Sequence, residues 1–245
     1  QRIRHALARE GFCLYQQEIR PLKSGGQGLR EILVRMVDPT GGHLAPGDFI
    51  PIAEHHDLVS SIDRWVVRHS LSFLERNGQH PLAAARVSIN LSGHSLGDEA
   101  FLEDMLSYLE ASKVPTDRIF FEITETTAVA NLSRALRFIE ALRNLGCRFI
   151  LDDFGSGFSS FAYLKNLPVD ILKIDGEFVR SMESDPIRRA MVTSINQVAQ
   201  VMGIETIAEW VETEATYDML RDLGVDYVQG YWLHRPEELV KSSDR

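Results

Sequence analysis

The chain has 245 residues, of which 44% are hydrophobic, 25% charged and 9% aromatic. This composition is typical of soluble globular proteins and excludes a largely disordered chain. An α/β barrel commonly reaches this length as a single domain. The net charge of −9 at pH 7 argues against binding of a nucleic-acid polymer, because that function calls for a basic surface. A small phosphorylated ligand held through a metal ion is compatible with the same charge.

The apolar runs of the chain are short. None approaches the roughly 20 residues that span a bilayer, and the opening QRIRHALARE lacks the apolar core of a signal peptide. We therefore expect no membrane contact by this domain. Cys13 and Cys147 lie in apolar runs and are expected to be buried free thiols, which fits the cytoplasm. Because the chain starts at Gln1, we expect residues 1–245 to be one domain excised from a longer multidomain protein.

Strand-like and helix-like segments alternate along the chain. Stretches with helical period at 49–77, 98–111, 131–146, 185–202 and 213–223 separate β-rich runs, and they predict an α/β barrel or a doubly wound sheet. The segment KSGGQG at 23–28 predicts a hairpin that makes the first strand antiparallel to the second. The eight β-rich runs are 12–17, 29–36, 85–91, 118–123, 147–153, 169–175, 205–210 and 226–232.

Polar side chains recur toward the ends of these runs. In a closed parallel barrel the carboxyl ends of the strands share one rim, so these groups should converge. Carboxylates a few Å apart repel each other by about 4 kcal/mol per pair at an effective dielectric of 20, which predicts a bound cation. The oxygen donors favour Mg²⁺ or Mn²⁺ over Zn²⁺. The groups are Glu31, Asn90, Glu122, Asp152 with Asp153, Lys173 with Asp175, Glu209 and Gln229.

This set suggests hydrolysis at phosphorus. Asp152 could bridge two ions while Asp153 reaches the second, and two ions can activate a water for in-line displacement. Lys173 could fix that water or neutralise developing charge. Simpler readings exist, because an acid at a strand end often caps the next helix, Asn90 and Ser92 could form such a cap, and Lys173 could be a surface charge. The recurrence of polar groups on six or seven runs favours the metal site.

Three other features each allow two interpretations. Arg35 lies on the same side of its strand as Glu31 and either clamps a phosphate or pairs with a carboxylate. The EHHD segment at 54–57 looks like a metal cluster, but a solvated helix end is the favoured interpretation, since adjacent histidines face different ways on a helix. Gly155, Ser156 and Gly157 predict a sharp turn after the paired aspartates, either a mobile loop that serves the metal site or a turn without function.

The motifs EILVR, NLS, FEITET, DDFGSGFSSFAYLKNLPVDILKID, TIAEWVET and VQGYWLHRP occur in this order from Phe12 to about Leu239. In these motifs the chain resembles the EAL-domain phosphodiesterases of bacterial cyclic di-GMP signalling. The resemblance implies a modified TIM (β/α)8 barrel with an antiparallel first strand. It also implies hydrolysis of cyclic di-GMP to linear pGpG, with two Mg²⁺ or Mn²⁺ ions as cofactors, Ca²⁺ as an inhibitory ion and a homodimer as the assembly.

The resemblance also implies roles for individual residues. Lys173 and Glu209 would handle the attacking water, with Glu209 as the general base. The implied metal ligands are Glu31, Asn90, Glu122, Asp152 and, for the second ion, Asp153. The implied substrate contacts are Gln17, Arg35 and Gln229. The implied loop-anchoring group is Glu125 and Glu212 with Gly155, Ser156 and Gly157. A rival hypothesis is a cyclic di-GMP receptor that binds without cleaving and acts through a protein partner, but the complete set of carboxylates favours the enzyme.

Some positions depart from the pattern of this family. Ile32 replaces an alanine, and its side chain should face away from Glu31. Trp210 replaces a glycine, Trp232 follows the QGY segment, and either ring would narrow the pocket or alter its dynamics. Glu18 stands where a proline is common, which bears only on the local strand.

Overall fold

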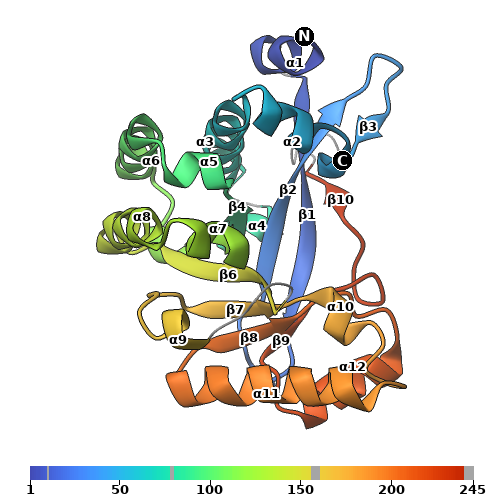
Figure 1. Cartoon of the computed structure of the whole chain (residues 1–245). Coiled ribbons are helices and arrows are strands. Elements are labelled where there is room, and N and C mark those ends of the chain that lie inside the picture. The colour runs from blue at the N-terminus through green and yellow to red at the C-terminus, as the bar shows by residue number, and fades with distance from the viewer. Residues whose placement is uncertain (10, 78–79, 156–160, 240–245) are drawn as a thin grey trace.

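The computed structural model describes residues 1–9, 11–77, 80–155 and 161–239 (Figure 1). In this part of the chain ten strands form one sheet in the order β10-β1-β9-β8-β7-β6-β5-β4-β2-β3, and an additional pairing of β1 with β2 closes it. The strands are β1 (Phe12–Pro21), β2 (Leu29–Val37), β3 (His43–Leu44), β4 (Arg86–Asn90), β5 (Ile119–Thr124), β6 (Arg148–Phe154), β7 (Ile171–Ile174), β8 (Glu205–Ala208), β9 (Tyr227–Val228) and β10 (Glu237–Glu238).

Eight of these strands form a closed barrel, namely all except β3 and β10. β1 runs antiparallel to both of its barrel neighbours, β2 and β9, whereas every other neighbouring pair in the barrel is parallel. The predicted modified TIM barrel and its antiparallel first strand are therefore confirmed. The two-residue strands β3 and β10 were not predicted, because so short a segment carries no periodicity that could be read.

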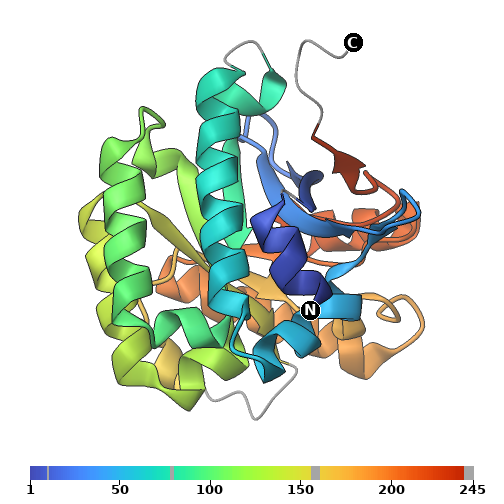
Figure 2. The ribbon, with the colours of Figure 1, turned by 90° about the horizontal axis from the view of Figure 1, so that it is seen from above.

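Helices surround the barrel, and their apolar faces build most of the core against the outside of the sheet (Figures 1 and 2). α3, α6 and α8 cover one side, while α11 and α12 cover another. The elements are α1 (Arg2–Ala8), α2 (Pro46–His55), α3 (Val59–Arg76), α4 (Pro81–Ala84), α5 (Gly93–Leu96), α6 (Glu99–Ala111), the 3-10 helix η1 (Thr116–Arg118), α7 (Glu125–Ala130), α8 (Leu132–Asn144), α9 (Phe161–Leu164), α10 (Gly176–Val179), α11 (Pro186–Met202) and α12 (Glu214–Asp222).

The ends of α6 and α11 follow ordinary capping chemistry. Asp98 and Asp185 accept backbone N–H groups in the first turns of α6 and α11. α11 ends at Gly203, whose φ of 72° is the left-handed conformation that glycine adopts without strain. The EHHD segment closes α2, and both of its histidines are exposed, as expected for a solvated helix end. None of the helices in the described ranges has the length and apolar character needed to cross a membrane.

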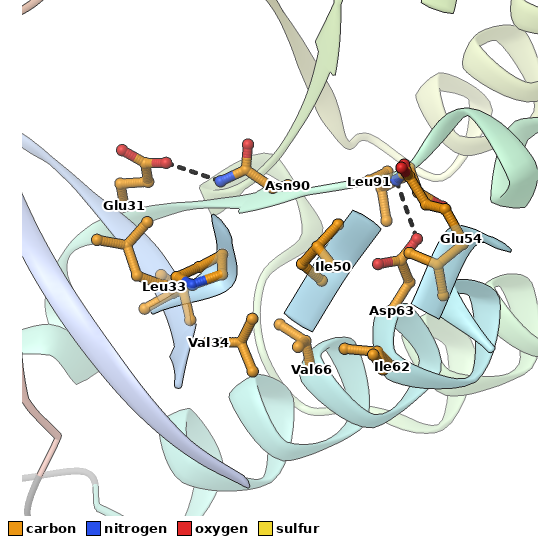
Figure 3. A pocket seen from close by; sticks show the side chains of 14 residues that line it. Glu31, Leu33, Val34, Ile50, Glu54, Ile62, Asp63, Val66, Asn90 and Leu91 are labelled. Atoms are coloured by element: carbon orange, nitrogen blue, oxygen red, sulfur yellow. Dashed lines mark hydrogen bonds between the residues drawn. The ribbon is translucent and has the colours of Figure 1, made fainter. Parts of the chain in front are cut away.

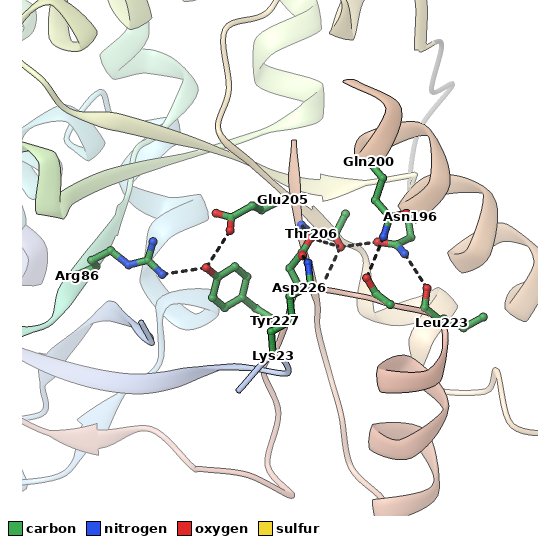
Figure 4. A network of polar contacts seen from close by, with 10 residues as sticks. Lys23, Arg86, Asn196, Gln200, Glu205, Thr206, Leu223, Asp226 and Tyr227 are labelled. Carbon is green, nitrogen blue, oxygen red and sulfur yellow. Dashed lines mark hydrogen bonds and ion pairs between the residues drawn. The ribbon is translucent and has the colours of Figure 1, made fainter. Parts of the chain in front are cut away.

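The interior of the barrel is divided into layers along its axis. An apolar layer fills the middle, and its members are Ile19, Leu29, Phe120, Ile150, Ile171, Ile207 and Tyr227. Below it, at the ends where the parallel strands begin, a polar network joins neighbouring strands (Figure 4). Asp226 accepts hydrogen bonds from Thr206 N at 3.0 Å and from Lys23 Nζ at 2.6 Å. Tyr227 accepts from Arg86 at 3.0 Å and donates to Glu205 at 3.1 Å.

Candidate active site

The chemically important side chains form the layer directly above the apolar one. Side chains alternate along a strand, so a residue two positions beyond an inward-facing residue also faces inward. Leu29 and Phe120 belong to the apolar layer, and Glu31 and Glu122 follow them by two positions. The same spacing relates Ile150 to Asp152, Ile171 to Lys173, Ile207 to Glu209 and Tyr227 to Gln229. The strand periodicity thus stacks one ring of polar groups on one ring of apolar groups.

Lys173 lies at the centre of this polar layer. Its Nζ atom is 2.8 Å from Glu209, 2.9 Å from Glu122, 3.3 Å from Asp152 and 3.7 Å from Glu31. The residue is only 1% exposed, so the reading of Lys173 as a surface charge is wrong. One ammonium group cannot neutralise four carboxylates, and the layer retains an excess of negative charge that favours a bound cation.

A second set of contacts joins Glu31 to two amide side chains and, through one of them, to a third. Glu31 accepts hydrogen bonds from Asn90 Nδ2 at 2.7 Å and from Gln229 Nε2 at 2.6 Å. Gln229 also donates to Gln17 at 3.0 Å. These contacts bring β1, β2, β4 and the end of β9 together at one place in the barrel rim. Rotation of the Asn90 amide by 180° would present its oxygen to a cation.

The carboxylates resist ionisation in this crowded layer. Burial and the neighbouring Glu31 charge raise the pKa of Glu122 to about 8, although Lys173 acts in the opposite direction. Burial likewise raises the pKa of Glu209 well above its ordinary value against the effect of Lys173. For Lys173, burial alone would lower the pKa, but the carboxylates around it, Asp152 first, raise it well above its ordinary value. A divalent cation would relieve the repulsion among these acids.

The described residues fit a divalent metal ion. Glu122 Oε1 and Gln229 Oε1 are buried and make no hydrogen bond of ordinary geometry within the described ranges, which leaves two oxygen atoms for a ligand. Carboxylate oxygens of Asp152, Asp153 and Glu209 all lie within 4.8 Å of one another. The donors are hard oxygens, which suit Mg²⁺ or Mn²⁺.

Asp153 takes an unusual backbone conformation beside this group. Its φ is 55°, a region that non-glycine residues seldom occupy. Partial desolvation and the adjacent Asp152 charge raise the pKa of Asp153 to about 6. Strained conformations of this kind concentrate at functional sites. In contrast, the nearby Asp175 caps α10 by accepting a hydrogen bond from Glu177 N at 2.9 Å. Asp175 is therefore an N-cap, which was the simpler interpretation of an acid at the end of a strand.

The residues assigned to the loop divide into two groups. Glu125 is buried and accepts hydrogen bonds from Gly155 N at 3.0 Å and from Tyr163 Oη at 2.6 Å, so it holds the start of the turn after Asp153. Ser156 and Gly157 lie outside the described residues. Glu212 has an ion-pair distance of 3.8 Å to Arg180.

Arg35 is not brought to the carboxylate layer. Its guanidinium lies over the Tyr15 ring at 5.1 Å and donates to Val34 O at 2.9 Å. Within the described ranges it forms no ion pair with a carboxylate, which leaves its charge available to a ligand. Arg35 nevertheless faces the same side of the ribbon as Glu31, four residues along the strand, or about 13 Å at the usual rise.

Two cavities open from the two sides of Glu31. One, of about 360 Å³, runs between β2 and the helices α2 and α3 (Figure 3). Glu31 and Asn90 lie at one end of it, and Asp63 lies at the other. Asp63 accepts hydrogen bonds from Ser92 N at 2.9 Å and Ser95 Oγ at 2.6 Å, yet burial keeps its pKa raised. Asp63 was not predicted, although an acid between the apolar Ile62 and Val66 of one helical segment was a usable signal.

The second cavity, of about 380 Å³, lies between Glu209 and the exposed ring of Trp210. Its wall also includes Gln17, Arg180 and Tyr231. Trp210 has a φ of 52°, the left-handed region in which glycine carries no penalty. Its ring packs on Gly176, where a Cβ atom would collide with it. Trp210 therefore does form part of a pocket wall, whereas Trp232 packs against Tyr217 at 5.1 Å.

A closed barrel with one antiparallel strand and a rim of carboxylates around a buried lysine defines an α/β-barrel protein with a candidate metal centre. The sequence profile of the EAL domain matches residues 1–236. The chain therefore belongs to the EAL domain family, and the resemblance seen in the sequence is confirmed.

Named relatives and solved structures agree with this assignment. The chain is 43% identical over 240 residues to the cyclic di-GMP phosphodiesterase PdeB of Shewanella oneidensis, covering 98% of this chain and 28% of that protein. It is 36% identical over 239 residues to the cyclic di-GMP phosphodiesterase PdeF of Escherichia coli, covering 98% and 32%. The chain thus spans about a third of the length of these relatives.

Two solved structures have the same fold. The EAL domain of FimX from Pseudomonas aeruginosa bound to c-di-GMP superposes with a TM-score of 0.89 and 28% identity, covering 96% of this chain and 95% of that chain. The PaMucR phosphodiesterase in its c-di-GMP complex has a TM-score of 0.89 and 31% identity, with the same coverage.

Proposed function

We propose that this domain is a metal-dependent phosphodiesterase that hydrolyses one phosphodiester bond of cyclic di-GMP to give linear pGpG. The observation that carries this proposal is the contact of Lys173 with four carboxylates, between two cavities that both reach Glu31. The two cavities give space for two nucleotide halves on either side of a phosphate. The names of the relatives and the bound ligand of the solved structures support the choice of substrate.

We assign the metal-holding role to the oxygen donors of the rim. These are Glu31, Asn90, Glu122 and Asp152 for one ion and Asp153 for a second ion. When bound, Mg²⁺ or Mn²⁺ supplies charge neutralisation at phosphorus and a water that ionises near neutral pH. Ca²⁺ should compete for the same oxygens without supporting turnover, because it prefers longer bonds and more ligands.

The protein side chains supply binding and proton transfer. Glu209, with its raised pKa, takes the proton of the attacking water, and Lys173 keeps its charge beside the developing negative charge. Gln17 and Gln229 border the second cavity and would contact the ligand there. Arg35 would reach a ligand through its guanidinium, and Glu125 would hold the turn beginning at Gly155.

The test is release of pGpG from cyclic di-GMP by the wild-type domain with Mn²⁺ or Mg²⁺, with Asp152→Ala as the inactive control. Turnover in the wild type and its loss in the variant are expected. Cyclic di-GMP binding without turnover in either protein would instead support the rival function, a receptor acting through a partner. Addition of Ca²⁺ to the active enzyme should slow release and be reversed by excess Mn²⁺.

The setting of the domain forms part of the same proposal. We infer that residues 1–245 are one domain of a longer protein, since the curated relatives are about three times as long. The two free cysteines fit a reducing cytoplasm. We also infer a homodimer that forms near residues 158–170, of which 158–160 lie outside the described residues. Light scattering of the purified domain tests this inference, because it measures the molecular mass in solution.

A further inference from the structure

A second group of metal-type ligands lies outside the carboxylate rim. It combines Cys13 of β1, His43 of β3 and Glu238 of β10, whose ligand atoms all lie within 4.8 Å of one another. The proposed hydrolysis uses none of these three residues. They come from three distant parts of the sequence, so only the closure of the sheet brings them together (Figure 1).

The strand register explains why the three side chains share one face. Cys13 pairs with Arg35 across β1 and β2, and His43 pairs with Val37, two residues beyond Arg35. Glu238 pairs with Tyr15, two residues beyond Cys13. Directly paired residues and residues two apart lie on the same side of a sheet, so Cys13, His43 and Glu238 all face one way.

The ligand types select a different ion from the carboxylate rim. One sulfur, one imidazole nitrogen and one carboxylate oxygen suit Zn²⁺ and related transition-metal ions, whereas an all-oxygen site suits Mg²⁺ or Mn²⁺. Three protein ligands with a fourth position open to water form a common zinc arrangement. His43 and Glu238 are exposed and Cys13 is half-buried, so an ion can enter from solvent.

The surroundings of the group support binding. The Tyr15 hydroxyl lies 2.6 Å from His43 Nδ1 and fixes the position of the imidazole, as partners of metal-bound histidines commonly do. The charge of Arg35 is close but is directed over the Tyr15 ring at 5.1 Å. Burial and the Glu238 charge raise the pKa of Cys13 to about 11, so the thiol gives up its proton as the metal binds.

We propose that Cys13, His43 and Glu238 form a second metal site that binds Zn²⁺ or a chemically similar transition-metal ion. A bound ion ties the two outermost strands, β3 and β10, to β1. It does so on the face of β1 and β2 that also carries Arg35 and, four residues earlier in β2, Glu31. The site therefore links the C-terminal strand to the wall of the substrate cavities.

The test uses Co²⁺ as a spectroscopic substitute for Zn²⁺ on the whole domain. A cobalt–thiolate charge-transfer band should appear as Co²⁺ is titrated in, reach the intensity of one thiolate-bound ion per chain, and disappear when Zn²⁺ is added. Co²⁺ bound by the oxygen rim gives no such band, so the readout is independent of the proposed function. Cys13→Ser should abolish the band, while Cys147→Ser, which removes the only other cysteine, should leave it unchanged.

Affinity measurements on the other ligands complete the test. His43→Ala and Glu238→Gln should each weaken Zn²⁺ binding by at least about tenfold, and Tyr15→Phe by about 10- to 100-fold through loss of the histidine partner. Circular dichroism of each variant checks folding. The proposal is wrong if no thiolate band forms in the wild type, if the band survives Cys13→Ser, or if His43→Ala and Glu238→Gln bind Zn²⁺ as tightly as the wild type.

Discussion

Buried polar groups are paired differently at the two ends of the barrel. Where the parallel strands begin, Asp226 is paired with Lys23 and with the backbone and side chain of Thr206. Where the strands end, Glu122 and Glu209 share one lysine with two further acids. Both ends rest on the same apolar layer, which includes Ile207 and Tyr227. One end therefore pairs its charges within the protein, and the other leaves excess negative charge.

Buried polar groups at the first end of the barrel therefore serve stability, and those at the second end serve the proposed chemistry. Paired groups at the first end contribute to folding, because their removal would leave buried donors without partners. Crowded acids at the second end oppose folding of the ion-free protein, since burial raises their pKa values. Conflicts of this kind are expected at functional sites. Variants at the two ends should therefore change different observables.

The largest effect is expected from Glu209→Gln. Loss of the proton acceptor should lower kcat for cyclic di-GMP hydrolysis by about 10²- to 10⁴-fold. Thermal stability without metal should stay the same or rise, because the variant removes a carboxylate whose pKa is already raised by burial. Parallel assays of pGpG release and thermal unfolding measure the two effects. A stable variant that retains full turnover would rule out Glu209 as the general base.

At the opposite end, Asp226→Ala should destabilise the domain by about 1–3 kcal/mol. The substitution leaves the buried Thr206 N–H without its acceptor. Urea unfolding measures the change, and kcat at a temperature where the variant is folded should be close to the wild-type value. Asp222→Ala is the matched control, since that side chain is 79% exposed and should change stability by less than about 0.5 kcal/mol. Equal losses in the two variants would contradict the role of the network.

The crowded acids at the second end should also make the stability of the ion-free domain depend on pH. With a pKa of about 8 instead of 4.5, folded Glu122 keeps a proton that the unfolded chain releases between these values. The folded state then binds more protons, so the free energy of unfolding of the ion-free domain falls as pH rises from about 5 to 8. Thermal unfolding in the presence of a chelator measures this pH dependence of stability, and Glu122→Gln should reduce it. Stabilisation by Mn²⁺ should increase over the same pH range, because metal and protons compete.

The smallest effect concerns Trp210 at the edge of the second cavity. Trp210→Gly and Trp210→Ala both remove the ring, but only alanine keeps a Cβ atom at a φ of 52°. The glycine variant should therefore be about 1–2 kcal/mol more stable than the alanine variant. Denaturant unfolding compares the stability of the two variants. A change in KM for cyclic di-GMP that both variants share would show that the Trp210 ring contacts substrate. An alanine variant as stable as the glycine variant would show that the backbone is not strained there.

Much of the architecture could be predicted from local patterns. The β-rich runs located all eight barrel strands, and the glycine-rich segment at 23–28 indicated the hairpin that turns β1 against β2. Acids at strand ends pointed to one rim, because parallel strands of a barrel end on the same side. The two-residue strands β3 and β10 escaped prediction, since pairing with a neighbour and not periodicity makes them strands.

The sequence by itself determined the spacing of Glu31, Glu122 and Asp152 on their strands, because side-chain direction follows from chain periodicity alone. Which atoms then meet depended on closure of the barrel. Only the tertiary structure placed Lys173 among four carboxylates, Arg35 over Tyr15 and Glu212 beside Arg180. Contacts between strands far apart in the chain are set by register, shear and packing, and no local pattern of residues encodes them.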